Sequence, residues 1–145
     1  MPNKAIKVTG WFFLGIQKEQ HMTPTELMRE WIRRFNAADI DGLTQLYAEN
    51  VVNDQAVFSE PLVGRDAVRE LLEIDFGRAK MECIEERIYE CGDTAILQWK
   101  DPSGLKGCGF FQFKDGQIIH QKGYFDQLSF FKANRLPIPN DYLDT

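Results

Sequence analysis

The stretch that decides the fold is YAENVVNDQ at residues 47–55, followed after a short gap by PLVGRDAV at residues 61–68. It predicts the end of a helix, a short strand, a loop, and a new helix that Gly64-Arg65-Asp66 opens. The short strand matters for function, because a carboxylate on it could supply acid–base chemistry. Whether this chain has that carboxylate in place separates an enzyme from a binding protein.

Helices are expected on both sides of the short strand. Thr23-Pro24-Thr25-Glu26 has the spacing of a capping box, with proline at the first helical position. Apolar residues then recur at three-and-four spacing, so a first helix should run to about Ala38, where Asp39-Ile40-Asp41-Gly42 breaks it. A short second helix should bury Leu43, Leu46 and Tyr47. A third should begin near Gly64 and bury Val68, Leu71, Leu72 and Phe76.

Beyond Gly77 the pattern changes to that of strands. The expected strands are Met81 to Tyr89, Thr94 to Lys100, Lys106 to Phe113 and Gln117 to Phe131. Turn sequences separate them at residues 91–93, 101–104 and 114–116. Consecutive strands joined by tight turns form an antiparallel meander, and helices followed by strands predict an α+β domain.

Composition excludes several classes of function. The chain has 145 residues, of which 43% are hydrophobic, and this suits one globular domain. Its net charge of −5 argues against nucleic acid and against an anionic membrane surface as partners. Three cysteines without CxxC spacing and only two histidines argue against a zinc site or a disulfide framework. We expect no metal and no cofactor, and the free thiols fit a reducing cytoplasm.

Both ends are expected to lie outside the domain. Residues 1–22 contain the apolar run WFFLGI at 11–16, which is too short to span a bilayer and is followed by no signal-peptide cleavage site. We interpret this segment as an N-terminal extension that packs on the domain or on a neighbour. The domain is expected over residues 23–135, and residues 136–145 form an irregular tail that carries Pro137 and Pro139.

The order of these elements carries motifs of a known family. The motifs are FNAADIDGL at 35–43, LYAEN at 46–50, GRDAV at 64–68 and FKDGQII at 113–119, with Tyr124-Phe125-Asp126 after them. Over roughly residues 23–131 the pattern resembles the nuclear transport factor 2-like superfamily, in its SnoaL-like and ketosteroid isomerase-like branch. The resemblance implies a cone-like half-barrel, in which a curved antiparallel sheet wraps around about three N-terminal helices with an apolar pocket between them.

Two enzymes of this superfamily have catalytic positions that can be compared with the chain. The isomerase has a general base, a tyrosine and a protonated acid, which align with Gln55, Trp31 and Gly109. The epoxide hydrolase has an Asp-Arg-Asp relay, which aligns with Asp101, Trp99 and Gly123. Neither set is complete here, so the resemblance implies a fold and names no reaction.

Strand alternation gives an independent prediction of the pocket, because successive side chains face opposite sides of a sheet. The predicted ligand-binding residues are Trp31, Phe35, Gln55, Leu97, Trp99, Phe111, Gln121 and Phe125. Gly109 and Gly123 should leave room where relatives place carboxylates. Such a lining suits a flat, mostly apolar small molecule held by a few amide hydrogen bonds. The alternative is that the aromatic residues only fill the core.

Asp54 is the candidate catalytic residue. A bulge in the short strand would turn it inward, and burial among aromatic rings would raise its pKa. The alternative is that Asp54 faces solvent or caps a loop. Asp101 begins Asp-Pro-Ser-Gly, so a turn is the preferred interpretation of this second aspartate.

The last strand also presents an outer face, on which His120, Lys122, Tyr124 and Asp126 alternate. Together with the resemblance, this polar face predicts a homodimer through the outer face of the sheet. Three functions stay open. They are a proton-transfer isomerase, cyclase or hydratase with Asp54 as base, a non-catalytic binder of an apolar metabolite, and a dimeric accessory protein.

Overall fold

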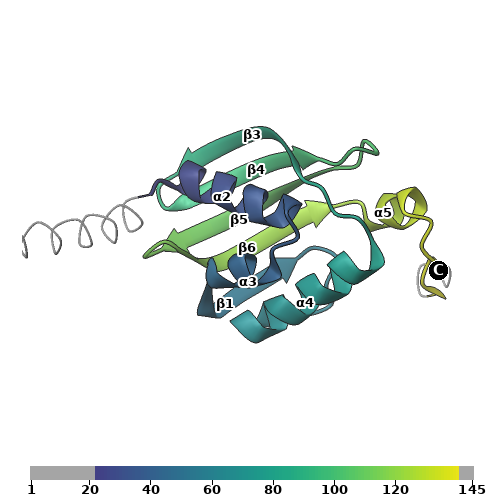
Figure 1. The fold of residues 1–145 in the computed structure, drawn as a ribbon, viewed down its shortest axis with the longest axis horizontal. Coiled ribbons are helices and arrows are strands. Elements are labelled where there is room, and N and C mark those ends of the chain that lie inside the picture. The colour runs from purple at the N-terminus through teal and green to yellow at the C-terminus, as the bar shows by residue number, and fades with distance from the viewer. Residues whose placement is uncertain (1–21, 141–145) are drawn as a thin grey trace, which may run out of the picture.

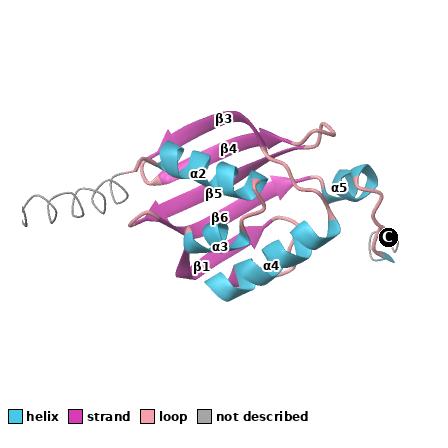
Figure 2. Ribbon diagram, viewed as in Figure 1, coloured by secondary structure: helices cyan, strands magenta, loops and turns pink. Residues whose placement is uncertain are grey.

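The computed structural model describes residues 22–140, as a sheet with helices packed on one of its faces (Figure 1). Figure 2 shows the two layers by type of element. In chain order the elements are α2 (Pro24–Asn36), α3 (Ile40–Gln45), β1 (Tyr47–Gln55), β2 (Leu62–Val63), α4 (Arg65–Arg78), β3 (Ile84–Cys91), β4 (Thr94–Lys100), β5 (Lys106–Lys114), β6 (Gln117–Phe125) and α5 (Gln127–Ala133). The predicted α+β class is confirmed.

The sheet has six strands in the order β2-β1-β6-β5-β4-β3 and is curved and unclosed. Every pair of neighbours is antiparallel except β1 and β6, which run parallel. The sheet is therefore mixed, whereas the sequence predicted an antiparallel one. The parallel pair arises because the chain leaves β1, crosses to the far edge through α4, and returns strand by strand until β6 reaches β1.

Two boundaries near the predicted short strand differ from the prediction. Helix α2 begins at Pro24 as expected, capped by the Thr23 side chain, but it ends at Asn36 because Ala38 adopts a positive φ of 51°. Tyr47 is the first residue of β1 and is not part of the second helix. The backbone here is held by the last strand, since the Ile118 N–H donates to the Leu46 carbonyl at 2.7 Å.

Two further boundaries depend on side-chain hydrogen bonds to the backbone. Strand β3 begins at Ile84 and not at Met81, because Asn36 bonds both the N–H and the C=O of Cys83, at 2.7 and 2.9 Å. The last strand ends at Phe125, and the predicted continuation to Phe131 is helix α5 instead. Asp126 caps this helix by accepting from the backbone N–H groups of its first turn.

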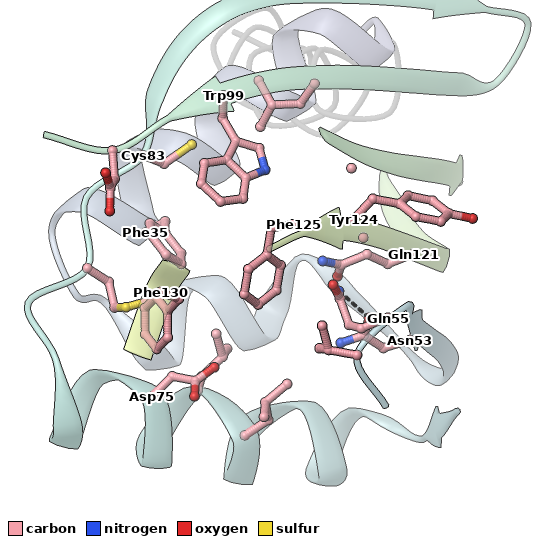
Figure 3. A pocket seen from close by; sticks show the side chains of 18 of the residues that line it. Phe35, Asn53, Gln55, Asp75, Cys83, Trp99, Gln121, Tyr124, Phe125 and Phe130 are labelled. Atoms are coloured by element: carbon pink, nitrogen blue, oxygen red, sulfur yellow. Dashed lines mark hydrogen bonds between the residues drawn. The ribbon is translucent and has the colours of Figure 1, made fainter. Parts of the chain in front are cut away.

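The core lies between the helices and the inner face of the sheet, where Met28, Leu43, Val51, Leu97 and Ile118 are at most 1% exposed. Next to this core, the helices and the sheet enclose a cavity (Figure 3). No helix within residues 22–140 has both the length and the apolar character needed to cross a bilayer.

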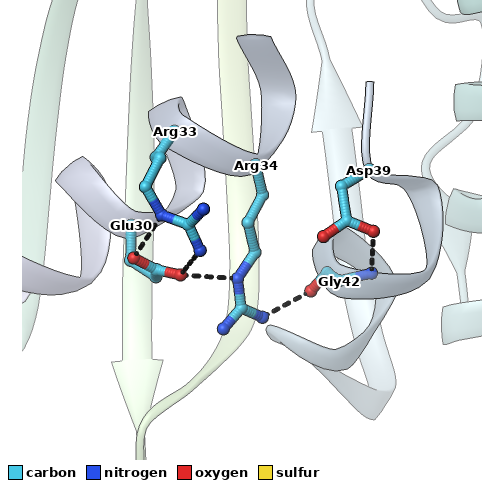
Figure 4. A network of polar contacts seen from close by, with 5 residues as sticks. All are labelled: Glu30, Arg33, Arg34, Asp39 and Gly42. Atoms are coloured by element: carbon cyan, nitrogen blue, oxygen red, sulfur yellow. Dashed lines mark hydrogen bonds and ion pairs between the residues drawn. The ribbon is translucent and has the colours of Figure 1, made fainter. Parts of the chain in front are cut away.

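A polar network holds α2 against α3 (Figure 4). Glu30 accepts from both Arg33 and Arg34, and the hydrogen bond from Arg33 lowers the pKa of Glu30 to about 2. Arg34 also donates to the Gly42 carbonyl at 2.6 Å, while Asp39 caps α3 by accepting from the Gly42 N–H at 2.9 Å. Gly42 is therefore enclosed, and a Cβ atom there would lie 2.1 Å from Asp39 Oδ2.

We predict that Gly42→Ala lowers the free energy of unfolding by about 1–2 kcal/mol, because the added methyl group displaces the Asp39 cap. The matched control is Gly77→Ala in α4, where a Cβ atom meets nothing within 4 Å. Removing this helical glycine should raise the free energy of unfolding by about 0.5–1 kcal/mol. Urea unfolding measures both, and equal effects of the two substitutions would contradict the prediction.

Candidate functional site

The cavity holds about 200 Å³ and lies between the inner face of the sheet, α2, α4 and the beginning of α5. Its wall includes all eight residues that the sequence predicted as a pocket lining: Trp31, Phe35, Gln55, Leu97, Trp99, Phe111, Gln121 and Phe125. Their role in binding a ligand stays a prediction. Their shared location follows from strand alternation on β4, β5 and β6, together with the inner face of α2.

The aromatic side chains of the wall form two groups. Trp31 stacks on Phe35 with ring centroids 4.8 Å apart and contacts Phe111 at 5.3 Å, and Trp31 and Phe111 are buried in the core. Phe125 contacts Trp99 at 6.2 Å and Phe130 at 6.1 Å, nearer the α5 end (Figure 3). The first group therefore fills the core as well as facing the cavity. The second group contains the partly exposed rings of Trp99 and Phe125.

The glycines of β5 and β6 do not leave open space, and this corrects the prediction. A Cβ atom on Gly109 would lie 2.7 Å from the Phe111 ring, and one on Gly123 would lie 1.8 Å from Gln55 Oε1. On Gly107 it would lie 2.3 Å from the Trp99 ring. Each glycine therefore allows a neighbouring side chain to lie flat against the sheet, and these side chains form the wall of the cavity.

Hydrogen bonds connect the polar side chains at one end of the cavity. Trp31 Nε1 donates to the Tyr47 hydroxyl at 3.0 Å, and that hydroxyl donates to Gln121 Oε1 at 2.7 Å. Beside them, Gln55 Nε2 donates to Asn53 Oδ1 at 2.8 Å. Burial raises the pKa of Tyr47, so its hydroxyl keeps its proton. This end of the cavity is therefore polar and neutral.

A carboxylate lies at the other end. Asp75 projects from α4 towards the cavity, and its side chain is 22% exposed (Figure 3). Its enclosed Oδ1 atom forms an ion pair with Arg78 Nη2 at 2.8 Å, and no other group within residues 22–140 bonds to this oxygen. Burial raises the pKa of Asp75 above its ordinary value of 3.8, and Arg78 opposes that rise.

Asp54 does not reach the cavity. Strand β1 pairs with β6 without interruption from Val52 to Gln55, so Asn53 and Gln55 point inward and Asp54 lies opposite Lys122 on the other face. The irregularity in this strand falls earlier, between Tyr47 and Val52. The bulge that would have turned Asp54 inward is therefore absent at the position where the hypothesis needed it.

Two other groups at the cavity, Asp101 and Cys83, have structural or unreactive surroundings. Asp101 forms the predicted turn, because its Oδ1 atom accepts from the N–H groups of Ser103 and Leu105, each at 2.9 Å. Burial raises the pKa of the Cys83 thiol to about 12, which keeps it protonated. Within the described part of the chain, no three His, Cys, Asp or Glu side chains come together in a way that could hold a metal ion.

Residues 28–121 match the model of the SnoaL-like domain. The chain belongs to the SnoaL-like family. The resemblance predicted from sequence is thereby confirmed, and no curated protein matches the chain in sequence.

Solved structures with the same fold are similar to this SnoaL-like chain. One is a putative polyketide cyclase of Pseudomonas putida KT2440, with a TM-score of 0.68 and 20% identity over 77% of this chain and 98% of that one. Another is an epoxide hydrolase of M. tuberculosis, with a TM-score of 0.62 and 21% identity over 75% of this chain and 86% of that one. A third is an NTF2-like protein of unknown function from Cytophaga hutchinsonii, with a TM-score of 0.64 and 18% identity over 77% of this chain and 96% of that one. At these identities the likeness shows the fold alone.

Sequence reasoning missed Asp75, Tyr47 and Asn53 as groups of the cavity. Asp75 could have been found, since it follows Val68 and Leu72 on the apolar side of the predicted third helix. Asn53 shares a face of the short strand with Val51 and Gln55, so strand alternation could have placed it in the cavity wall beside Gln55. Tyr47 could not be found while it was assigned to a helix.

We predict that Tyr47→Phe destabilises the SnoaL-like domain by about 1–3 kcal/mol, because Trp31 Nε1 loses its buried acceptor and Gln121 Oε1 loses its donor. Tyr124→Phe is the control, since Tyr124 is 47% exposed on the outer face. It should change the free energy of unfolding by less than about 0.5 kcal/mol. Urea unfolding measures both variants. An equal decrease in the free energy of unfolding in the two would show that the buried hydrogen bonds contribute nothing to stability.

Proposed function

We propose that this SnoaL-like protein is a small-molecule enzyme that transfers a proton in the cavity, as an isomerase, cyclase or hydratase, with Asp75 as the general base. One observation carries the proposal. The carboxyl group of Asp75 lines a cavity walled mainly by aromatic and aliphatic side chains, with Arg78 as its ion-pair partner. Burial makes this carboxylate a stronger base than one in water, because hydration stabilises its charge less.

The surroundings of Asp75 suit a group that gains and loses a proton. Desolvation raises its pKa towards the range in which a carboxyl group can act both as base and as acid. Arg78 keeps that rise limited, and its guanidinium lies over the rings of Phe130 and Phe131, 5.6 and 5.8 Å from their centroids. Arg78 therefore holds the carboxylate near the α5 end of the cavity through an ion pair with Oδ1.

The proposed substrate is a small, flat and mostly apolar molecule. The rings of Trp99 and Phe125 offer partly exposed apolar surface, and the amide groups of Gln55 and Gln121 supply hydrogen bonds at the opposite end. The similar structures described as a polyketide cyclase and as an epoxide hydrolase agree with small-molecule chemistry in this fold.

A non-catalytic binder is the second candidate, and the Asp75–Arg78 pair is the observation that favours it. These residues join the end of α4 to α5 through the contact of Arg78 with Phe130. In a binder, this ion pair would close one end of the cavity and would have no chemical role.

The test uses 5-nitrobenzisoxazole, a flat probe whose reaction needs only a base. The base removes the proton on the ring carbon, the released electron pair completes a nitrile, and the N–O bond breaks to give a coloured phenolate. We expect Asp75→Asn to lower the rate of this elimination by about 100-fold. Because the carboxylate is the active form, the wild-type rate should rise with pH through an inflection above 3.8.

Asp54→Asn is the matched control, because it makes the same change on the face of β1 that lies away from the cavity. It should leave the rate unchanged. A loss of rate in Asp54→Asn without one in Asp75→Asn would overturn the proposal and return the role of base to Asp54. Saturable binding of the probe without turnover would favour the binder.

We also propose that the protein forms a homodimer through the outer face of the sheet. Tyr89, Phe110 and Tyr124 are 41%, 36% and 47% exposed there, and the rings of Phe110 and Tyr124 lie 6.0 Å apart. Lys122 pairs with Phe110 in the strand register, and Asp54 pairs with Lys122 on its other side. Aromatic residues with few charges are typical of the centre of an interface.

Lys122→Glu should raise the dimer dissociation constant at least tenfold, because it places two carboxylates side by side in this face. Lys114→Glu makes the same charge change at the end of β5 and should have no such effect. Sedimentation velocity across a concentration series measures both variants. An unchanged dissociation constant in Lys122→Glu would count against this interface.

A further inference from the structure

The chain of hydrogen bonds from Trp31 to Gln121 can run in only one direction. An indole N–H donates and cannot accept, so the Tyr47 oxygen must accept from Trp31 Nε1. The single hydroxyl proton of Tyr47 is then directed to its other partner, Gln121, at 2.7 Å. Gln121 must therefore present its carbonyl oxygen to Tyr47.

This direction fixes the orientation of the Gln121 amide. With Oε1 held by Tyr47, the NH₂ group is the part of the side chain that is left for the cavity. Gln121 as a whole is only 8% exposed. Within residues 22–140 the fully enclosed side-chain atom without a hydrogen bond is Asp75 Oδ1, so Nε2 of Gln121 is not enclosed in this way. Figure 3 shows the amide of Gln121 beside Phe125, on the side of the cavity away from Asp75.

We infer that Gln121 Nε2 is a specificity-determining hydrogen-bond donor, and that the ligand presents an acceptor oxygen to it. This oxygen is a carbonyl, or the enolate or phenolate oxygen that forms when a neighbouring proton is removed. The inference rests on the proposed function, since it places the donor across the cavity from the base. Trp31 and Tyr47 are positioning residues, because they act only through the orientation of the Gln121 amide.

The geometry also disfavours a ligand that can only donate hydrogen bonds. A ligand with only N–H donors would reach just the second lone pair of Gln121 Oε1, which already accepts from Tyr47, and would leave Nε2 without an acceptor. A buried donor without a partner costs more than a hydrogen bond gains. The site should therefore prefer a ketone over the hydrocarbon of the same shape, which leaves Gln121 Nε2 without an acceptor.

The test compares 9-fluorenone with fluorene, two flat probes that differ by a carbonyl in place of a CH₂ group. Calorimetry gives the ratio of the fluorene to the fluorenone dissociation constant. We expect this ratio to fall about fivefold to tenfold in Gln121→Met, which removes the donor and keeps the length of the side chain. Gln117→Met is the control on the same strand, because Gln117 donates to the Gln45 carbonyl and does not line the cavity. Its ratio should equal that of the wild type.

A second readout reports the hydrogen bond itself. The infrared carbonyl stretch of bound fluorenone should lie at lower frequency in the wild type than in Gln121→Met. Tyr47→Phe keeps Gln121 but frees its amide to rotate, so it should give an intermediate ratio and an intermediate stretch. A structural role for Tyr47 alone would change stability and leave both values as in the wild type. The wild-type stretch, compared with that of fluorenone in an alkane, tests the donor even where a variant fails to fold.

The outcomes separate this inference from the proposed function. If both probes bind and their ratio and the stretch are the same in wild type and Gln121→Met, the inference is overturned while the role of Asp75 stands. If neither probe binds the wild type, the proposed apolar ligand is overturned and the inference with it. A lowered ratio and a shifted stretch in Gln121→Met, with intermediate values in Tyr47→Phe and unchanged values in Gln117→Met, would support it.

Discussion

The parallel pairing of β1 with β6 determines which chemistry the cavity contains. It sets Asn53 opposite Gln121 and Gln55 opposite Gly123, and it leaves Asp54 on the outer face beside Lys122. A shift of one residue would exchange the inward and outward sets of the whole strand. The cavity would then gain a carboxylate from β1 and lose the two amides of that strand, Asn53 and Gln55. The end of the cavity that β1 and β6 line is therefore neutral because of the strand register more than because of the composition.

Given this register, the cavity has a donor end and a basic end. Neutral side chains connected from Trp31 through Tyr47 occupy the first, and Asp75 occupies the second with Arg78 beside it. The two ends differ in how their charge is controlled. Hydrogen bonds fix the orientation of the amide, whereas burial and one nearby cation oppose each other at the carboxylate. In the proposed function, this arrangement removes a proton at one point of the substrate and stabilises the charge that develops at another.

Membership of the family gives the fold, whereas the residues at individual positions determine the chemistry. The positions at which related enzymes place catalytic groups hold Trp31, Gly109 and Gly123 in this chain. At both glycines a Cβ atom would meet a neighbouring side chain, that of Phe111 or of Gln55, so the absence of a side chain at these positions is coupled to the packing of the wall. A fold can keep its cavity while the groups that line it differ between members, and in this chain Asp75 on α4 lines the cavity whereas Asp54 on the short strand does not.

The sequence by itself determined the features that depend on neighbours along the chain. The start of α2 at Pro24, the limits of β4 and the inward set of the meander strands follow from capping, turn sequences and alternation. Only the tertiary structure decided the rest. The parallel strand pair, the helix after Phe125 and the filling of the glycine positions all depend on contacts between distant residues, such as Gln55 with Gly123 and Arg78 with Phe130. No local pattern specifies such contacts, because they form and stabilise the protein only once the helices have packed on the sheet.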